Sequence, residues 1–342
     1  MTPIRWMPFP CEAVACRGLA WIEENLPDLW RLPRGSVRDL PEGVRRQQRF
    51  SSGARLRLRC DTSELHVKVA QPAACAATGL DVYLDGRFRG TASVPARAEA
   101  DVVCFTGASR EMRDVTVYLP VRAEVRIVAC GIDGDAVCER PSAFAVDRPM
   151  VVYGSSVAQG IGAARPGTSY AAVLGRSMEV DVVNLGFGGA GKAEAAVVDL
   201  VARADACCYL LDLGKSYGRQ PVEPYGAMLA TLRDAHPDVP IVCITPIVST
   251  REVWSEEYAD LSHHTRSVMR EAVAKQKTGG DTGLFLMEGE TLLSRQDLDG
   301  LSGDGVHPND LGHRLIADRL RPIIETALRG ADAMGSNGHD RS

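Results

Sequence analysis

The strongest constraint on the fold is a change of hydrophobic pattern near residue 145. Before it, apolar and polar residues alternate, as in "RLRLRC" (55–60) and "ELHVKVA" (64–70). After it, near-continuous apolar runs such as "PMVVYG" (149–154) are separated by segments with helical spacing. Alternation indicates strands with one buried face, whereas continuous runs are typical of parallel strands covered on both faces. The chain is therefore predicted to form two architectures in succession.

The first part, residues 1–145, is predicted to be an antiparallel β-sandwich of jelly-roll-like form. Its alternating segments recur at short spacing, with Asp-Gly and Pro turns between them, and this pattern favours a sandwich. The expected strands lie at 55–60, 64–70, 80–94, 114–119 and 123–132.

The second part, residues 146–330, is predicted to be an α/β domain of the doubly wound kind, with a parallel sheet between two layers of helices. Ligands of such sheets bind at the carboxyl ends of the strands. The tail, 331–342, is predicted to be disordered. The expected strands are 149–154, 180–186, 207–214 and 240–247, and the expected helices are 168–178, 192–203, 222–235, 256–276 and 308–330.

Composition narrows the class of protein. The 342 residues carry 39 Lys and Arg against 44 Asp and Glu, a net charge of −5, which gives no electrostatic reason to expect nucleic acid or an anionic membrane as a partner. Neither a membrane-spanning run nor a signal peptide is recognised, so a cytoplasmic location is expected. The ten cysteines contain no CxxC pair and are predicted to be reduced, packed thiols, without a structural metal or a cofactor.

Four loops at the expected strand ends carry the candidate chemistry. The most informative is "SGDGVHPND" (302–310), where the Asp304 carboxylate could fix the tautomer of His307 and leave its other nitrogen free to accept a proton. Alternatively, Asp304 caps the next helix and His307 is a surface residue. The other three loops are Gly154-Ser155-Ser156, "NLGFGGAGK" (184–192) and "DLGKSYG" (212–218).

A serine at a strand-to-helix turn becomes a nucleophile when a base removes its proton, and otherwise it is a helix cap. Backbone N–H groups of "GFGGAG" could stabilise an oxyanion, although a plain turn or a phosphate loop remain alternatives. A dinucleotide site is discounted, because the GxGxxG pattern is not met.

In these loops the chain resembles the SGNH (GDSL-type) hydrolases. Gly154-Ser155-Ser156 matches the first block in the form of a GSS subgroup, which implies that Ser156 is the nucleophile. "NLGFGG" (184–189) resembles the second block, with Gly189 as the implied oxyanion donor, and "DGVHP" (304–308) resembles the last, with Asp304 and His307 as triad members. "ARPGTSY" (164–170) also resembles the subgroup, and "TGLDVYLDG" (78–86) is similar to the GxDLY signature of a preceding sandwich.

The third block departs from the family pattern. The family usually places an Asn there as an oxyanion donor, but this chain has no Asn between residues 185 and 308. Alignment on "YLLDLGKSYG" puts Ser216 at that position with Lys215 beside it, and either one, or a backbone N–H, could replace the Asn. Ala190 also stands where an Asn often follows the glycine of the second block.

Three hypotheses of function follow. The first is a serine esterase or deacylase that acts through an acyl-enzyme on an ester, such as an acetyl ester, of a small polar molecule or a carbohydrate. The second is an acyltransferase with the same Ser-His-Asp site in small-molecule biosynthesis, and the third is a binding protein with a weakened site. Arg165 is a candidate for binding an anionic substrate group. A homo-oligomer is compatible with the sequence, which leaves the role of the sandwich open.

Overall fold

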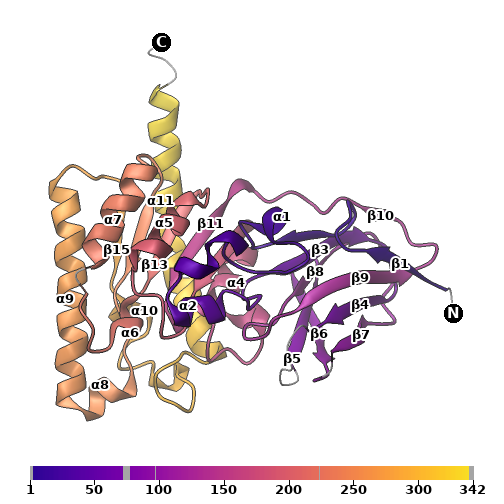
Figure 1. Cartoon of the computed structure of the whole chain (residues 1–342), viewed down its shortest axis with the longest axis horizontal. Coiled ribbons are helices and arrows are strands. Elements are labelled where there is room, and N and C mark those ends of the chain that lie inside the picture. Colours follow the sequence, from indigo (N-terminus) through magenta and orange to yellow (C-terminus); the bar gives the residue numbers. More distant parts are fainter. Residues whose placement is uncertain (1–2, 72–77, 97, 223, 339–342) are drawn as a thin grey trace. The chain divides into compact units, whose positions relative to one another are not determined.

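The computed structural model describes residues 3–71, 78–96, 98–222 and 224–338, apart from the side chains of residues 331–338. The chain divides into two compact units (Figure 1). The first comprises Met1–Ser36, Gln48–Ala145 and Arg165–Gly167, and the second comprises Val37–Gln47, Val146–Ala164 and Thr168–Ser342. The units thus differ from the predicted continuous domains, because contacts place residues 37–47 in the second unit and residues 165–167 in the first.

The first unit contains two antiparallel sheets. One has the strand order β1-β9-β4-β7, and the other has the order β10-β3-β8-β5-β6, with β2 also paired to β3. The strands are β1 (Ile4–Pro8), β2 (Ala15–Arg17), β3 (Arg55–Cys60), β4 (Leu65–Ala70), β5 (Thr78–Leu84), β6 (Arg87–Val94), β7 (Glu99–Phe105), β8 (Arg113–Tyr118), β9 (Arg126–Asp133) and β10 (Cys138–Glu139); the helical segments of this unit are α1 (Ile22–Asn25) and the first half of η1 (Arg34–Asp39), whose last three residues belong to the second unit.

The alternating sequence pattern accounts for the core between these sheets. Leu65, Val67 and Val69 of β4 are buried while the residues between them are half-buried, as expected for a strand with one face turned inward. They join Leu56 and Leu58 of β3, from the other sheet, in one hydrophobic cluster. The predicted antiparallel sandwich is therefore confirmed, with β1, β2, β7 and β10 as strands that the sequence pattern did not reveal.

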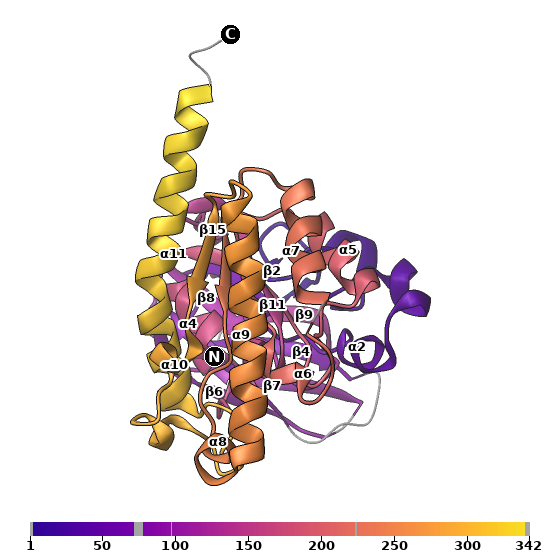
Figure 2. The same cartoon turned by 90° about the vertical axis from the view of Figure 1, so that its left-hand side faces the viewer.

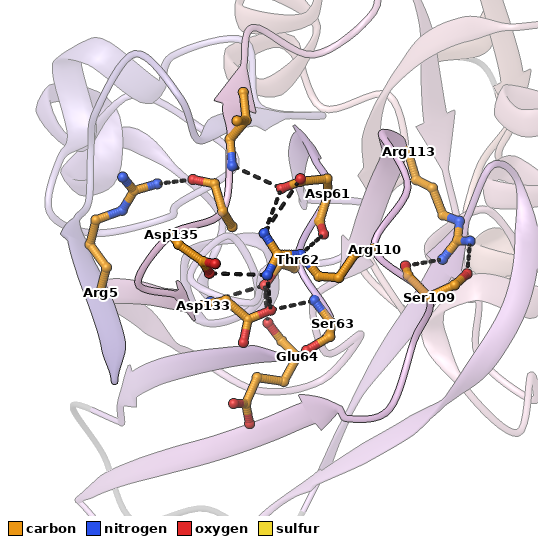
Figure 3. A network of polar contacts seen from close by, with 12 residues as sticks. Arg5, Asp61, Thr62, Ser63, Glu64, Ser109, Arg110, Arg113, Asp133 and Asp135 are labelled. Carbon is orange, nitrogen blue, oxygen red and sulfur yellow. Dashed lines mark hydrogen bonds and ion pairs between the residues drawn. The ribbon is translucent and has the colours of Figure 1, made fainter. Parts of the chain in front are cut away.

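One end of the sandwich is held by a guanidinium surrounded by carboxylates (Figure 3). Arg110 lies in the loop after β7 and donates to the Asp61 carbonyl at 2.6 Å and to the Asp135 carboxylate at 3.0 Å. Its Nη1 is also 3.8 Å from Asp133, whose carboxylate accepts from the Ser63 N–H at 2.5 Å. One cation thus joins the loops that follow β3, β7 and β9.

The second unit is built on a parallel sheet with the strand order β12-β11-β13-β14-β15. Its strands are β11 (Val146–Gly154), β12 (Val180–Gly186), β13 (Cys208–Asp212), β14 (Ile241–Ile244) and β15 (Leu284–Met287). Its helices are α2 (Glu42–Gln47), α3 (Ser156–Gln159), α4 (Tyr170–Ser177), α5 (Ala195–Arg203), α6 (Gly214–Tyr217), α7 (Pro224–Ala235), α8 (Thr250–Trp254), α9 (Glu256–Thr278), α10 (Gly289–Leu292) and α11 (Asp310–Gly338), with the short 3₁₀ turn η3 (Leu298–Gly300). Of the 3₁₀ turn η2 (Pro166–Thr168), only Thr168 belongs to this unit.

Helices cover both faces of this sheet. Figure 2 shows α11 on one side of β15 and α9, α7 and α5 on the other. On the α11 side, Ile316 and Leu320 pack with Tyr170 of α4 and with Val152 and Leu210 of the sheet. The predicted α/β/α architecture is thereby confirmed. The chain leaves β11 toward β12 and then crosses to β13, so the topological switch point, where such folds bind ligands, lies between the carboxyl ends of β11 and β13.

Two features of this part of the chain refine the sequence predictions. Helix α11 continues to Gly338, so the expected disordered tail is helical over residues 331–338; the Ala and Met residues among 331–334 have a high intrinsic preference for helix. Residues 339–342 of that tail lie outside the described residues, as does Cys75. The other nine cysteines are free thiols, seven of them buried. In the described part of the chain, no helix is both long and apolar enough to cross a membrane.

Candidate active site

Ser156, His307 and Asp304 form one hydrogen-bonded chain. His307 Nε2 lies 2.8 Å from Ser156 Oγ, and His307 Nδ1 lies 2.5 Å from Asp304 Oδ2. The structure therefore brings together three side chains that come from two loops more than 140 residues apart in the sequence. In this arrangement the carboxylate holds the proton on Nδ1 and leaves the Nε2 lone pair directed at the serine hydroxyl, which is the geometry for removing its proton.

The two serines after β11 have different contacts. Ser155 is fully buried, its N–H donates to the Asp212 carbonyl at 2.8 Å, and its hydroxyl accepts from the Val157 N–H at 3.3 Å. Ser155 thus caps α3. Ser156 is the first residue of that helix and points its hydroxyl at His307. Ser155 is thus the helix cap, and Ser156 is the serine whose hydroxyl faces the imidazole.

The loop before α11 fixes the Asp304 carboxylate. Its Oδ1 accepts from the Ser302 hydroxyl at 2.9 Å, from the Val306 N–H at 2.8 Å and from the His307 N–H at 3.0 Å. Burial alone would raise the pKa of Asp304, but these hydrogen bonds and the one from the His307 ring outweigh it and hold the pKa well below its usual range. Asp304 is therefore an anion throughout the neutral range.

Gly305 anchors this loop to α8. Its carbonyl accepts from the Thr250 N–H at 2.9 Å and from the Thr250 hydroxyl at 3.1 Å. With φ at +67° and the Thr250 hydroxyl only 2.0 Å from where a Cβ would sit, the position admits no side chain. The glycine between Asp304 and His307 thus lets the loop seat against α8 while keeping the two catalytic candidates in register.

Two backbone N–H groups near the serine are available to an oxyanion. Among the described residues, neither the Ser156 N–H nor the Gly189 N–H has a hydrogen-bond acceptor. The preceding residue, Gly188, lies beside the nucleophile, because a Cβ built on it would be 3.4 Å from the Ser156 Cβ. Unpaired donors at this point match the requirement of a tetrahedral intermediate, whose negative oxygen needs preorganised donors.

The two predicted substitutes for the missing Asn have different environments. Ser216 on α6 is nine-tenths buried, and its hydroxyl has no partner within the described chain. Helix α6 packs against α3, which carries Ser156. Lys215 is turned to Glu252, with Nζ 3.3 Å from Oε1, and Glu252 also pairs with the buried Arg266 at 2.7 Å. Lys215 therefore belongs to a buried ion-pair cluster with Glu252 and Arg266, and its role as an oxyanion donor stays a prediction.

Burial lowers the pKa of Lys215 to about 8, while the neighbouring Glu252 carboxylate acts to raise it.

Two other buried titratable groups contact Tyr170. The Tyr170 hydroxyl donates to Asp212 Oδ2 at 3.1 Å, and its N–H donates to His313 Nδ1 at 3.3 Å. Burial raises the pKa of Asp212 to about 6 and lowers that of His313 to about 4.

Arg165 has contacts other than those expected. Its guanidinium lies 3.0 Å from the fully buried Asp81 carboxylate and 3.2 Å from the Tyr83 hydroxyl, and it stacks on Phe88. The Gly167 N–H donates to the same carboxylate at 2.8 Å. Asp81 and Tyr83 belong to the GxDLY-like segment, so that segment holds residues 165–167. The structure thus shows Arg165 in contacts with Asp81, Tyr83 and Phe88, and its contact with a substrate stays a prediction.

Two glutamines that the sequence did not single out contact the second-block loop. Gln47 Nε2 donates to the Gly188 carbonyl at 2.6 Å, and the Gly188 N–H donates to Gln47 Oε1 at 2.8 Å and to Gln159 Oε1 at 2.9 Å. Gln159 follows the nucleophile by three residues, a spacing that could have suggested it. Nothing in the sequence connects Gln47 to this loop. No group of three or more His, Cys, Asp or Glu side chains suited to a metal occurs in the part of the chain that the structure describes.

Comparison with family models matches both parts of the chain. A model described as the GDSL-like Lipase/Acylhydrolase family matches residues 147–325, and the GxDLY model, described as the N-terminus of Esterase_SGNH_hydro-type, matches residues 4–138. Both resemblances inferred from the sequence are therefore confirmed. A search of curated proteins gives no match.

Solved structures share the fold over almost the whole chain. A GDSL-like lipase from Bacteroides ovatus ATCC 8483 is 25% identical, covers 96% of this chain and 98% of its own, and has a TM-score of 0.82. A salicylyl-acyltransferase from a tetracycline biosynthetic pathway is 23% identical, with 94% and 97% covered and a TM-score of 0.81. An acetyl xylan esterase from the rumen bacterium Butyrivibrio proteoclasticus is 13% identical, with 95% and 99% covered and a TM-score of 0.65.

Proposed function

The chain belongs to the GDSL-like lipase/acylhydrolase family, and on that premise we propose that it is a serine esterase that removes an acyl group from a small polar molecule or a carbohydrate. The observation that carries the proposal is the hydrogen-bonded chain from Asp304 through His307 to Ser156. A binding protein with a decayed site would have no need to hold these three groups at 2.5 and 2.8 Å.

The proposed reaction proceeds through an acyl-enzyme. Ser156 Oγ attacks the acyl carbon while His307 Nε2 accepts its proton, and the imidazolium that forms is stabilised by Asp304. The carbonyl oxygen becomes an anion held by the N–H groups of Ser156 and Gly189. His307 then protonates the leaving alcohol, and water, deprotonated by His307, attacks the acyl-enzyme to release the acid.

Ser216 is the candidate for a third oxyanion donor. Its buried hydroxyl carries a proton with no acceptor among the described residues, and it lies on the helix that packs against α3. A hydroxyl reaches less far from the backbone than an Asn amide and donates only one hydrogen bond. We therefore expect a weaker third donor than the Asn of the family pattern, and correspondingly slower hydrolysis.

Acyl transfer is the second candidate function. It is favoured by the similarity to the salicylyl-acyltransferase, which extends over almost the whole of both chains. The acyl-enzyme would be the same, and an alcohol or amine of a second substrate would replace water. The similarity to the acetyl xylan esterase favours instead an acetylated sugar as substrate and water as acceptor.

Product analysis separates the two functions. The protein is incubated with a panel of p-nitrophenyl acyl esters and acetylated sugars, with and without an alcohol or amine acceptor, and free acid and transferred acyl product are both quantified. Free acid alone supports the esterase, and a dominant transfer product supports the acyltransferase. Absence of both products, together with no labelling of Ser156 by a fluorophosphonate, would refute serine catalysis.

A further inference from the structure

Helix α2 contacts the loop that carries the candidate oxyanion donor. Its last residue, Gln47, forms a pair of hydrogen bonds with Gly188, one in each direction, at 2.6 and 2.8 Å. Its second residue, Gly43, lies against Ala190 in the same loop, where a Cβ on Gly43 would be 2.9 Å from the Ala190 Cβ. Residues four apart share one face of a helix, so α2 presents this face to residues 188–190.

Peptide geometry makes the Gly188 carbonyl important. That carbonyl and the Gly189 N–H belong to the same planar trans peptide and point in opposite directions. A hydrogen bond that fixes the carbonyl on one side therefore also fixes the direction of the N–H on the other. Gln47 Nε2 supplies that bond, whereas the Gly189 N–H itself has no acceptor among the described residues to hold it.

We propose that Gln47 is a positioning residue, which locks the 188–189 peptide with the Gly189 N–H directed toward the oxyanion formed at Ser156. The inference rests on the proposed function, since it concerns the same site. Gly189 has φ at +68°, and both residues of the peptide are glycines, so the plane can rotate at little steric cost when it is released. Gln47 supplies the restraint that the glycines lack.

Gln159 holds a different part of the loop. Its Oε1 accepts from the Gly188 N–H, which belongs to the preceding peptide, 187–188. Two acceptors therefore fix one peptide, and of these two glutamines Gln47 alone also binds the carbonyl of the next. The small side chains at positions 43 and 190 account for how α2 reaches the loop, and Ala190 in place of the Asn of the family pattern leaves room for it.

The test compares one substitution at two adjacent buried glutamines. Gln47→Met keeps the size of the side chain and removes both hydrogen bonds to Gly188. Gln48→Met is the control, because the Gln48 side chain is fully buried and its amide has no hydrogen-bond partner within the described chain. We expect Gln47→Met to lower kcat about 10- to 100-fold, a fraction of the 10²–10³-fold typical of a lost donor, with KM changed less than about threefold.

Gln47→Glu sharpens the comparison. The carboxylate can still accept from the Gly188 N–H, but it opposes the Gly188 carbonyl with a negative oxygen, so it should favour rotation of the peptide and lower kcat further than Met. Binding of an alkylboronic acid, which forms a tetrahedral anion on the serine, should weaken in parallel with kcat. A residue with only a structural role would lower the melting temperature without this parallel.

Amide hydrogen exchange tests the inference independently of turnover. Peptides that cover residues 184–192 should exchange faster in Gln47→Met than in the native protein and unchanged in Gln48→Met. If the native protein neither hydrolyses an ester nor transfers an acyl group, the proposed function fails, but amide hydrogen exchange still decides the role of Gln47. Unaltered exchange in Gln47→Met, or a kcat equal to that of Gln48→Met in an active protein, would overturn the inference.

Discussion

Replacing Asp304 with Asn should disable the serine through the tautomer of His307. Asp304 Oδ1 accepts three hydrogen bonds, from the Ser302 hydroxyl and from the N–H groups of Val306 and His307. An amide in this position keeps these bonds only if its oxygen takes the place of Oδ1. Its NH₂ group then replaces Oδ2 and faces His307 Nδ1, 2.5 Å away in the native protein.

The ring must then accept at Nδ1, so its proton moves to Nε2. With Nε2 protonated, His307 donates to Ser156 instead of accepting from it, and the general base is lost. An Asp-to-Asn change of this kind in a serine protease lowers kcat about 10⁴-fold, which corresponds to about 5 kcal/mol of transition-state stabilisation. The three donors to Oδ1 favour a loss of that size here.

The assay is kcat and KM for the best ester of the panel, with thermal unfolding as a check on the fold. KM should change little, because Asp304 does not touch the substrate in the proposed mechanism. Ser302→Ala is the matched control, since it removes one of the three donors and leaves the carboxylate in place; it should lower kcat less than about 10-fold.

A kcat of Asp304→Asn within about 10-fold of the native value would refute this role of the carboxylate. That result would mean that the amide turns its oxygen to His307 at the expense of the three donors, and that the hydrogen bonds of the loop do not dictate its orientation. A large loss in Ser302→Ala, equal to that of Asp304→Asn, would instead assign the orienting role to the loop as a whole.

The remaining predictions concern the serines, the third donor and pH. Ser156→Ala should abolish turnover and labelling by a fluorophosphonate, whereas Ser155→Ala removes only the cap of α3 and should keep much of the activity; the opposite result would move the nucleophile by one residue. Ser216→Asn should raise kcat on a simple acetyl ester about 10-fold, which is a part of the 10²–10³-fold effect of one oxyanion donor. Lys215→Met should lower the stability of the protein more than its kcat. If instead kcat falls in Ser216→Asn and Lys215→Met has a severe kcat defect, Lys215 is the donor. Burial lowers the pKa of His313 to about 4, which is below the value near 6.5 of a His in the unfolded chain. Between these two pH values the unfolded state binds more protons than the folded state. The free energy of unfolding therefore falls as the pH falls, by up to about 3 kcal/mol. In urea unfolding, the stability difference between the native protein and His313→Gln should shrink by that amount from pH 7 to pH 4, and a constant difference would show that His313 does not titrate in this window.

The sequence predicted those parts of the site that depend on strand ends. The loop after β11 was expected at the carboxyl edge of the sheet, and the resemblance of residues 304–308 to the last block of the family implied that His307 joins it there; Ser156 and His307 meet at 2.8 Å. The apolar run of each predicted strand was long enough to reveal it. The last strand, β15, was missed because Leu284–Met287 is short and partly exposed, so its pattern does not stand out from a loop.

Long-range polar contacts could not be predicted in the same way. Lys215 looked available beside Ser216, but its ammonium is taken by Glu252, which lies on a different element, 37 residues further along the chain. Gln47 and Gly188 are separated by 141 residues, and a single glutamine carries no periodicity or spacing that links it to a glycine loop. Such pairings depend on which surfaces pack together. A hydrophobic pattern predicts which face of an element is buried, but it does not predict which polar side chains meet at the edge of that face.

The exchange of segments between the two units bears on how members of this family can be recombined. Consider a chimera joined at residue 145, with residues 1–145 from a relative and the rest from this protein. The relative's α2 would then have to contact the oxyanion loop of this protein, and the relative's Asp81 would have to pair with Arg165 of this protein. Residues 37–47 and 165–167 should therefore travel with the partners that they contact. When domains are exchanged to change acyl specificity, the unit to transfer therefore includes these two short segments. A single junction in the gene would separate each segment from the residues that it contacts.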